Sequence, residues 1–120
     1  MSQETYTLFK FIDANTLVQE HLEQCEYQVC GYWDDQDKYY ETITLPRTLQ
    51  AELVSSSIGV IHKERFIQLK FLLMADAGDH TKTVGSKAQK LGELVLVYNE
   101  NLEFLDENWL LDVDSPLLFK

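Results

Sequence analysis

The chain has 120 residues, of which 45% are hydrophobic and 25% are charged. That composition is typical of one folded globular domain over residues 1–120, and it excludes a disordered chain. No basic stretch followed by an apolar one opens the sequence, so no signal peptide is expected. The longest nearly apolar run, Phe71 to Ala75, is far shorter than the roughly 20 residues that span a bilayer. The sequence predicts a soluble, cytoplasmic protein.

The net charge is −10 at pH 7, and it is unevenly distributed. Residues 1–62 carry ten acidic and three basic side chains, residues 63–90 three acidic and six basic, and residues 91–120 seven acidic and one basic. Clustered Lys and Arg bind nucleic acids and anionic membranes, so this composition argues against both partners. An acidic surface attracts a basic protein partner and speeds association with it. The same surface also keeps a small protein in solution, which is the plainer interpretation.

The N-terminal third predicts a strand and then a helix. Residues 5–12 are rich in aromatic and β-branched side chains, which indicates a strand. Asp13 or Asn15 can then cap a helix, because apolar side chains recur at helical spacing after them. We expect an amphipathic helix over residues 14–26, with an acidic outer face and an apolar face that covers a sheet.

Two strands are expected next, over residues 27–33 and 38–45. The acidic stretch 34–37 separates them, which predicts a hairpin. Pro46 should end the second strand, because proline has no N–H to donate to a neighbouring strand.

The stretch over residues 47–54 supports two interpretations. Its apolar side chains alternate as in a strand, yet it is rich in good helix formers, so we expect a short helix or an irregular strand. The three serines 55–57 should interrupt the pattern. Residues 58–61 and 65–74 then predict a hairpin around His62-Lys63-Glu64, since alternate side chains of the second arm are apolar.

The C-terminal part predicts a long loop and further strands. Residues 75–92 hold three glycines and many polar side chains, which indicates a loop with a short helix over residues 86–91 at most. Residues 93–98 and 102–105 predict another hairpin, and residues 109–113 a further strand. The expected fold class is α+β, with a mainly antiparallel sheet of five to seven strands and one N-terminal amphipathic helix packed on it.

The sequence holds no motif that assigns a chemistry. No serine lies in a G-x-S-x-G turn, and the glycines are too widely spaced for a phosphate-binding loop. The acidic stretch 34–37 lacks the Gly and Glu that an EF-hand requires. His21, Cys25 and Cys30 can be drawn as a three-ligand zinc cluster, but two cysteines in a core are more common. We therefore expect no metal and no cofactor, and a binding protein rather than an enzyme.

The favoured interpretation is a small acidic protein-binding domain of the inhibitor, immunity-protein or chaperone type. Its partner would be a basic protein, such as a toxin or a secreted client, which the acidic surface neutralises. Trp33 and Tyr39 are the expected anchors of the interface, because Trp and Tyr dominate binding energy in protein interfaces. The expected charged contacts lie in two sets, and they are Asp34, Asp35, Asp37, Glu100, Glu103, Asp106 and Glu107.

Two other functions stay open at this point. One is a small enzyme or ligand-binding domain, which would need a pocket that brings together at least two of His62, His80 and Cys30. The other is a structural subunit of a larger assembly. The sequence does not predict the oligomeric state.

Overall fold

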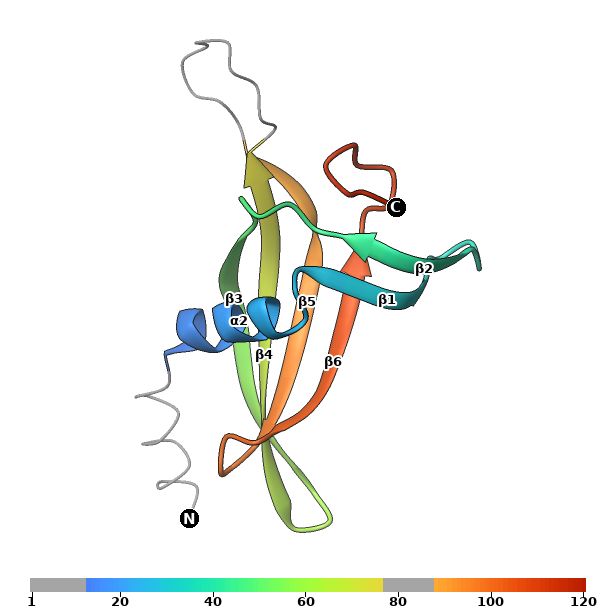
Figure 1. Ribbon diagram of the computed structural model, residues 1–120. Coiled ribbons are helices and arrows are strands. Elements are labelled where there is room, and N and C mark those ends of the chain that lie inside the picture. Colours follow the sequence, from blue (N-terminus) through green and yellow to red (C-terminus); the bar gives the residue numbers. More distant parts are fainter. Residues whose placement is uncertain (1–12, 77–87) are drawn as a thin grey trace.

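The structure is a computed structural model and describes residues 13–76 and 88–120. Within these ranges the chain forms one helix and six antiparallel strands, which confirms the predicted α+β class. The strands form two sheets rather than one, a pair in the order β1-β2 and a meander in the order β3-β4-β5-β6 (Figure 1). The elements are α2 (Ala14–Gln24), β1 (Gln28–Trp33), β2 (Tyr39–Thr44), β3 (Gln50–Ile61), β4 (Glu64–Asp76), β5 (Ala88–Asn99) and β6 (Phe104–Leu111).

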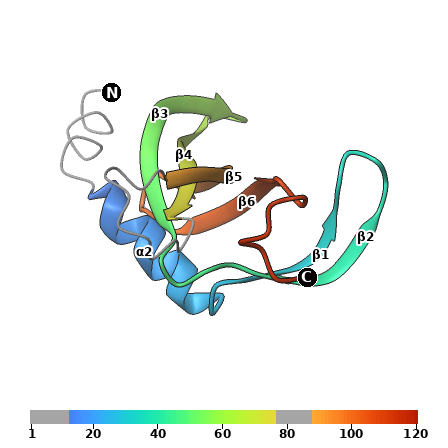
Figure 2. The ribbon, with the colours of Figure 1, turned by 90° about the horizontal axis from the view of Figure 1, so that it is seen from above.

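The predicted helix over residues 14–26 is confirmed as α2, which ends two residues earlier. Asp13 caps it, because its side chain accepts hydrogen bonds from the backbone N–H of Thr16 at 3.3 Å and from the Thr16 hydroxyl at 2.6 Å. Val18 and Leu22 are buried, and they belong to the same hydrophobic cluster as residues of the four-stranded sheet. In Figures 1 and 2, α2 runs across one face of that sheet.

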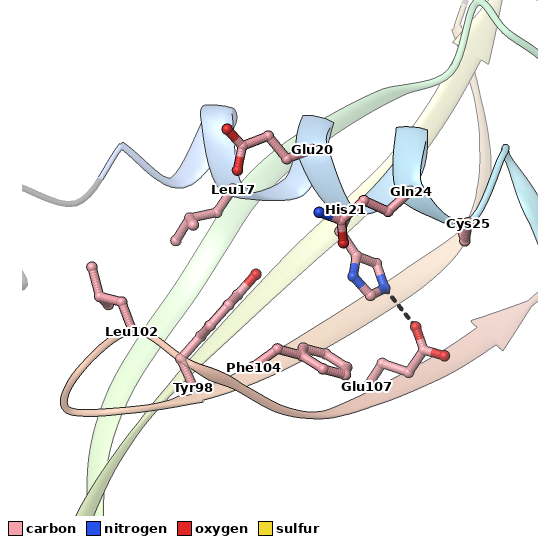
Figure 3. A pocket seen from close by; sticks show the side chains of 9 residues that line it. All are labelled: Leu17, Glu20, His21, Gln24, Cys25, Tyr98, Leu102, Phe104 and Glu107. Carbon is pink, nitrogen blue, oxygen red and sulfur yellow. Dashed lines mark hydrogen bonds and ion pairs between the residues drawn. The ribbon is translucent and has the colours of Figure 1, made fainter.

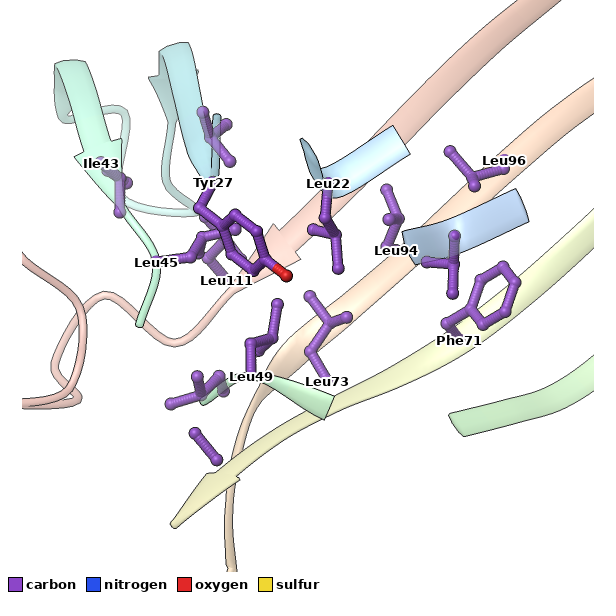
Figure 4. Close-up of a cluster of buried hydrophobic side chains, with 14 of the residues drawn as sticks. Leu22, Tyr27, Ile43, Leu45, Leu49, Phe71, Leu73, Leu94, Leu96 and Leu111 are labelled. Atoms are coloured by element: carbon purple, nitrogen blue, oxygen red, sulfur yellow. The ribbon is translucent and has the colours of Figure 1, made fainter. Parts of the chain in front are cut away.

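Alternating side chains give the four-stranded sheet a core face and an open face. On β4, Ile67, Leu69, Phe71 and Leu73 are fully buried, while the residues between them are half-exposed. On β5, Leu94, Leu96 and Tyr98 are buried opposite them. Figure 4 shows Leu22 of α2 beside Leu73 and Leu94 in this core. The core face is therefore the face that lies toward α2.

The β1–β2 pair extends the core beyond the edge of the four-stranded sheet. Ile43 is fully buried, and the hydroxyl of Tyr32 hydrogen-bonds to the backbone of Leu111 on β6. The C-terminal segment returns to this pair, because Thr44 and Phe119 exchange backbone hydrogen bonds of 2.8 and 3.0 Å. The short sheet is thus attached through side chains and the C-terminus, and not through a shared strand ladder.

Three predicted hairpins are confirmed by the register of their strands. β1 pairs with β2 across the acidic turn, and β5 pairs with β6 across residues 100–103. β3 pairs with β4 around a two-residue turn at His62 and Lys63, which adopt φ of 52° and 67°. Positive φ at both central positions is the geometry that matches the twist of the flanking strands.

Of the two interpretations of residues 47–54, the irregular strand is confirmed from Gln50 onward and the short helix is wrong. β3 begins at Gln50 and runs without a break to Ile61, with one register shift between Leu53 and Ser55. The three serines do not interrupt the strand. Each of them lies opposite a residue of β4, from Gln68 to Lys70. A long partner strand supplies the backbone hydrogen bonds, and this outweighs the weak strand preference of serine.

The loop expected over residues 75–92 is wrong at both ends, and residues 77–87 lie outside the described residues. Ala75 and Asp76 end β4, and residues 88–92 begin β5, so the short helix expected over residues 86–91 is wrong from Ala88 onward. A register shift between Leu73 and Met74 lets the two strands continue pairing to their ends.

Two other predicted strands have different outcomes. The strands expected over residues 102–105 and 109–113 are one strand, β6. The strand expected over residues 5–12 lies outside the described residues.

Candidate binding groove

A cavity of about 400 Å³ opens between α2 and the β5–β6 hairpin, and we call it the α2–β6 groove (Figure 3). The helix lines one wall and the hairpin lines the other. The lining residues are Leu17, Glu20, His21 and Gln24 from α2, its C-cap residue Cys25, and Tyr98, Leu102, Phe104 and Glu107 from the hairpin. Positions three and four apart on a helix share a face, which is why four residues of α2 reach one groove.

A contact between His21 and Glu107 joins the two walls. The Nε2 atom of His21 lies 2.5 Å from Oε1 of Glu107, and the histidine side chain is only 13% exposed. The imidazole ring also lies 5.2 Å from the Phe104 ring and 6.3 Å from the Trp109 ring, centroid to centroid. These neighbours fix the ring in place, so the hairpin and the helix hold the groove at a defined width.

The groove combines carboxylates with aromatic rings. Glu20 and Glu107 contribute carboxylates, Tyr98 and Phe104 contribute rings 6.1 Å apart, and none of the nine lining residues is Lys or Arg. Burial, and then the negative charge of Glu20, raises the pKa of the Tyr98 hydroxyl above its ordinary value. This arrangement favours a ligand that carries a positive charge.

The predicted anchors lie at the far end of the β1–β2 hairpin and are solvent-exposed. Trp33 is 61% exposed and Tyr39 is 50% exposed, and their ring centroids lie 4.9 Å apart. Between them the turn presents Asp35 and Asp37, both exposed. The structure therefore places the two expected anchors and two of the expected carboxylates at one tip.

Asp34 differs from the other acidic residues of this turn because it stabilises the turn itself. Its carboxylate accepts hydrogen bonds from the backbone N–H groups of Lys38 and Gln36 at 2.9 and 2.8 Å, and from the Tyr40 hydroxyl at 3.1 Å. The Lys38 hydrogen bond is the largest of the causes that lower the pKa of Asp34. Asp side chains that accept hydrogen bonds from nearby backbone N–H groups stabilise turns, so the Asp34 carboxylate has a structural role in this turn.

Three carboxylates of the second predicted set have partners within the molecule. Glu100 lies 3.7 Å from Arg65, and the Glu103 carboxylate accepts a hydrogen bond of 2.7 Å from the Asn99 amide. Glu107 pairs with His21. The carboxylate of the fourth, Asp106, accepts a hydrogen bond from the backbone N–H of Glu107.

The two predicted acidic sets do not form one surface. The turn over residues 34–37 lies at the outer tip of β1 and β2, and the turn over residues 100–103 lies at the other end of β6 (Figures 1 and 2). Of the nine predicted residues, only Glu107 lines the α2–β6 groove.

Among the His and Cys residues of the described chain, only His21 and Cys25 share a site, the α2–β6 groove. Cys25 lines the groove and its thiol donates to the Leu22 carbonyl, while Cys30 is exposed on β1, and both thiols are free. His62 lines a different cavity of about 610 Å³ beside the β3–β4 turn. His80 lies outside the described residues. In residues 13–76 and 88–120 no three His, Cys, Asp or Glu side chains are grouped so that they could hold a metal ion.

Several groove residues were not predicted from the sequence. Glu20 and Gln24 belong to the predicted helix and were not expected at a site, and Tyr98 and Phe104 were expected only as strand residues. A usable signal was present, because Glu20 and Gln24 are spaced four apart beside His21 and therefore share its side of the helix. What the sequence did not indicate is that β6 would lie opposite this side.

Comparisons with protein-family models, with curated proteins and with solved structures found no match for this chain. Within the described ranges, no helix is both long enough and apolar enough to cross a membrane. Function is therefore inferred from the chemistry of the groove and of the surfaces near it.

Proposed function

We propose that this domain binds a basic protein partner, and that a Lys or Arg side chain of the partner enters the α2–β6 groove. The observation that carries the proposal is the lining of the groove, where the Glu20 carboxylate and the Glu107 carboxylate, which contacts His21, stand beside the Tyr98 and Phe104 rings, and where no lining residue is Lys or Arg. A cation gains from both groups, since carboxylates strengthen its hydrogen bonds and ring faces attract it.

The size of the groove limits what it can hold. At about 400 Å³ it is at the small end of the range of ligand pockets, so it accepts one long side chain rather than a folded element. The rest of the interface must come from surrounding surface. Because exposed charges contribute, the affinity should fall as salt is added.

The exposed tip of the β1–β2 hairpin is a second contact in this proposal. Trp33 and Tyr39 are exposed together, and paired aromatic side chains of this kind are frequent anchors of interfaces. Asp35 and Asp37 add negative charge beside them. The tip and the groove lie at separate places on the domain, so a partner that contacts both must be large or extended.

A domain of this kind fits the class of small cytoplasmic inhibitors, immunity proteins and chaperones that neutralise a basic protein. A toxin with a positive cleft or a secreted client with a basic segment is the partner chemistry that the acidic surface complements. None of these roles requires a metal, a cofactor or a nucleophile in the binding domain.

The test compares two helix residues of the same type. Glu20→Gln removes a carboxylate from the groove, and Glu23→Gln removes one from the same helix outside the groove, so both variants have the same net charge. The probe is a hexa-arginine peptide, with a hexa-citrulline peptide as the uncharged control, followed by NMR chemical shifts of the full chain. We expect the charged peptide to shift the amides around Tyr98 in the wild type and in E23Q, and to bind E20Q severalfold more weakly. Equal affinity for the two variants would contradict the groove assignment.

Identification of the partner needs a separate experiment. The full chain is used as bait in native lysate, and bound proteins are eluted with increasing salt and identified by mass spectrometry. We expect basic proteins that elute at moderate salt and that the E20Q bait retains less well. Partners that are acidic, or that resist high salt equally with both baits, would argue against a charge-driven interface.

One observation favours a second candidate, a domain that binds a small molecule. The half-buried His21 contacts Glu107 and lies in the same groove as the Cys25 thiol, so polar groups of three kinds converge there. Under this alternative an amine-containing metabolite stabilises the domain in a thermal-shift screen, and the hexa-arginine peptide does not.

A further inference from the structure

The free edge of β3 is the feature that the proposed function does not use. β3 is the first strand of the four-stranded sheet, and among the described residues it pairs with β4 alone. It spans Gln50–Ile61, and most of its residues are exposed. An edge strand presents unpaired backbone groups that can pair with another strand.

The turn after β3 determines which backbone groups face outward. Ile61 and Glu64 flank a two-residue turn, and in such hairpins the flanking residues form a hydrogen-bonded pair. Hydrogen bonding then alternates along an antiparallel ladder. By this alternation the N–H and C=O groups of Ser56, Ile58 and Val60 are directed away from β4 and toward the free edge.

The edge lacks the features that normally prevent pairing. Residues 53–61 contain no charged residue and no proline, although the whole chain has a net charge of −10. Val60 is 62% exposed and Val54 is 50% exposed. The opposite edge of the sheet is different, because β6 carries Asp106 and Glu107 in its middle. Charges on an edge strand are a common protection against association, and β3 has none over this stretch.

The pattern of the same stretch is close to symmetric. Two apolar residues stand at each end of it, and three serines lie near the centre, in the order Leu53, Val54, Ser55, Ser56, Ser57, Ile58, Gly59, Val60 and Ile61. An antiparallel copy centred on Ser57 brings Val60 toward Val54, which lies at the register shift between Leu53 and Ser55. It also sets Ser56 opposite Ile58, two residues whose backbone groups both face outward. In this register the two β3 strands can form backbone hydrogen bonds and also bring apolar side chains together.

We propose that two copies of this chain pair through the free edge of β3, antiparallel and centred on Ser57, so that their four-stranded sheets become continuous. The two-fold axis of such a pair passes through the sheet and uses the same surface on both copies. A second copy is favoured over a basic partner because the edge is uncharged. Two copies that meet along this stretch set no carboxylates of residues 53–61 opposite one another, because the stretch holds none. This inference does not depend on the proposed function of the groove.

The test measures the mass of the full chain by sedimentation as a function of concentration. We expect the wild type to approach twice its mass of 14.0 kDa. Val60→Glu should weaken the dimer at least about tenfold, because each copy then brings a charge to the edge. Ser56→Pro should do the same, because it removes an outward N–H that the β3–β4 ladder does not use.

The control variant is Leu110→Glu, which puts the same charge at a residue of similar exposure on β6. It should leave the dimer unchanged. A wild type that stays monomeric at all concentrations would overturn the proposal, and so would a dimer that Val60→Glu and Leu110→Glu weaken equally. Far-UV circular dichroism of each variant shows whether the fold is retained.

Cross-linking tests the register. At the centre of the pair Ser57 lies opposite its own copy in a non-hydrogen-bonded position, where the close Cβ atoms suit a disulfide. In a Cys30→Ser background, Ser57→Cys should form a covalent dimer under mild oxidation much faster than Ser55→Cys, which lies opposite Gly59. Equal rates would overturn pairing centred on Ser57.

Discussion

The hydroxyl of Tyr32 joins the short sheet to the long one, and its removal should destabilise the domain measurably. The oxygen accepts a hydrogen bond of 2.9 Å from the backbone N–H of Leu111, and the hydroxyl faces the Leu111 carbonyl at 3.5 Å. Both residues are buried. Tyr32→Phe keeps the ring and its packing but leaves the N–H of Leu111 without its partner, in a place that water does not reach easily.

The size of the effect follows from that unpaired group. A buried donor that loses its acceptor costs about 1–3 kcal/mol, in a domain whose whole free energy of unfolding is of the order of 5–15 kcal/mol. For a chain of this length each kcal/mol lowers the Tm by about 3–5 °C. Tyr32→Phe should therefore lower the Tm by roughly 3–15 °C. It should also loosen the hairpin that carries the exposed Trp33.

Urea unfolding followed by Trp fluorescence and by circular dichroism measures the change in free energy. The matched control is Tyr39→Phe, which removes a hydroxyl from an exposed ring of the same hairpin and should cost less than about 0.5 kcal/mol. If Tyr32→Phe is as stable as Tyr39→Phe, then the Tyr32 hydrogen bond does not join the two sheets as argued.

Three further predictions concern single residues. Hydrogen bonds lower the pKa of Asp34 below 3.8, so its stabilising effect is complete above that value and is lost as the pH falls through the folded-state pKa. Asp34→Ala should thus be less stable than the wild type at neutral pH, and urea unfolding at a series of pH values should show the difference vanish in acid. Gly92 has φ of +151°, and an added Cβ would lie 2.1 Å from the Leu110 carbonyl oxygen. Gly92→Ala should lower the free energy of unfolding by at least about 2 kcal/mol, and a loss under about 0.5 kcal/mol would contradict the close approach. The Cys30 thiol is exposed and that of Cys25 is half-buried, so a thiol reagent should label Cys30 first, and equal rates would contradict this placement.

Much of the fold could be predicted from signals that lie within a few residues of each other. The helix from Ala14 to Gln24 has an apolar stripe at helical spacing and a capping Asp13. The alternation of apolar residues in β4 and the acidic turn after Trp33 likewise indicated a half-buried strand and a hairpin. Such patterns reflect local backbone preferences, which depend only on residues close together in the sequence.

Other elements depend on a partner strand and were predicted poorly. Ser55 to Ser57 and the start of β5 at Ala88 have weak strand preference, yet they are strands because β4 lies beside them and pairs with their backbone. The division of six strands into two sheets depends in the same way on tertiary contact. The two sheets are joined by contacts such as the hydrogen bond between Tyr32 and Leu111, and no local sequence pattern predicts these contacts.

The sequence alone determined three features of this protein. They are its net negative charge, its α+β class and the acidic residues of the β1–β2 turn. The tertiary structure decided which carboxylates are paired within the molecule and which are exposed to a partner. It pairs Glu100 with Arg65 and, across 86 positions of the chain, Glu107 with His21. It also brings α2 against β6 so that a groove forms between them. The physical reason is that net charge and the periodicity of apolar residues are properties of the sequence itself. A site depends instead on the packing of elements that are distant in sequence.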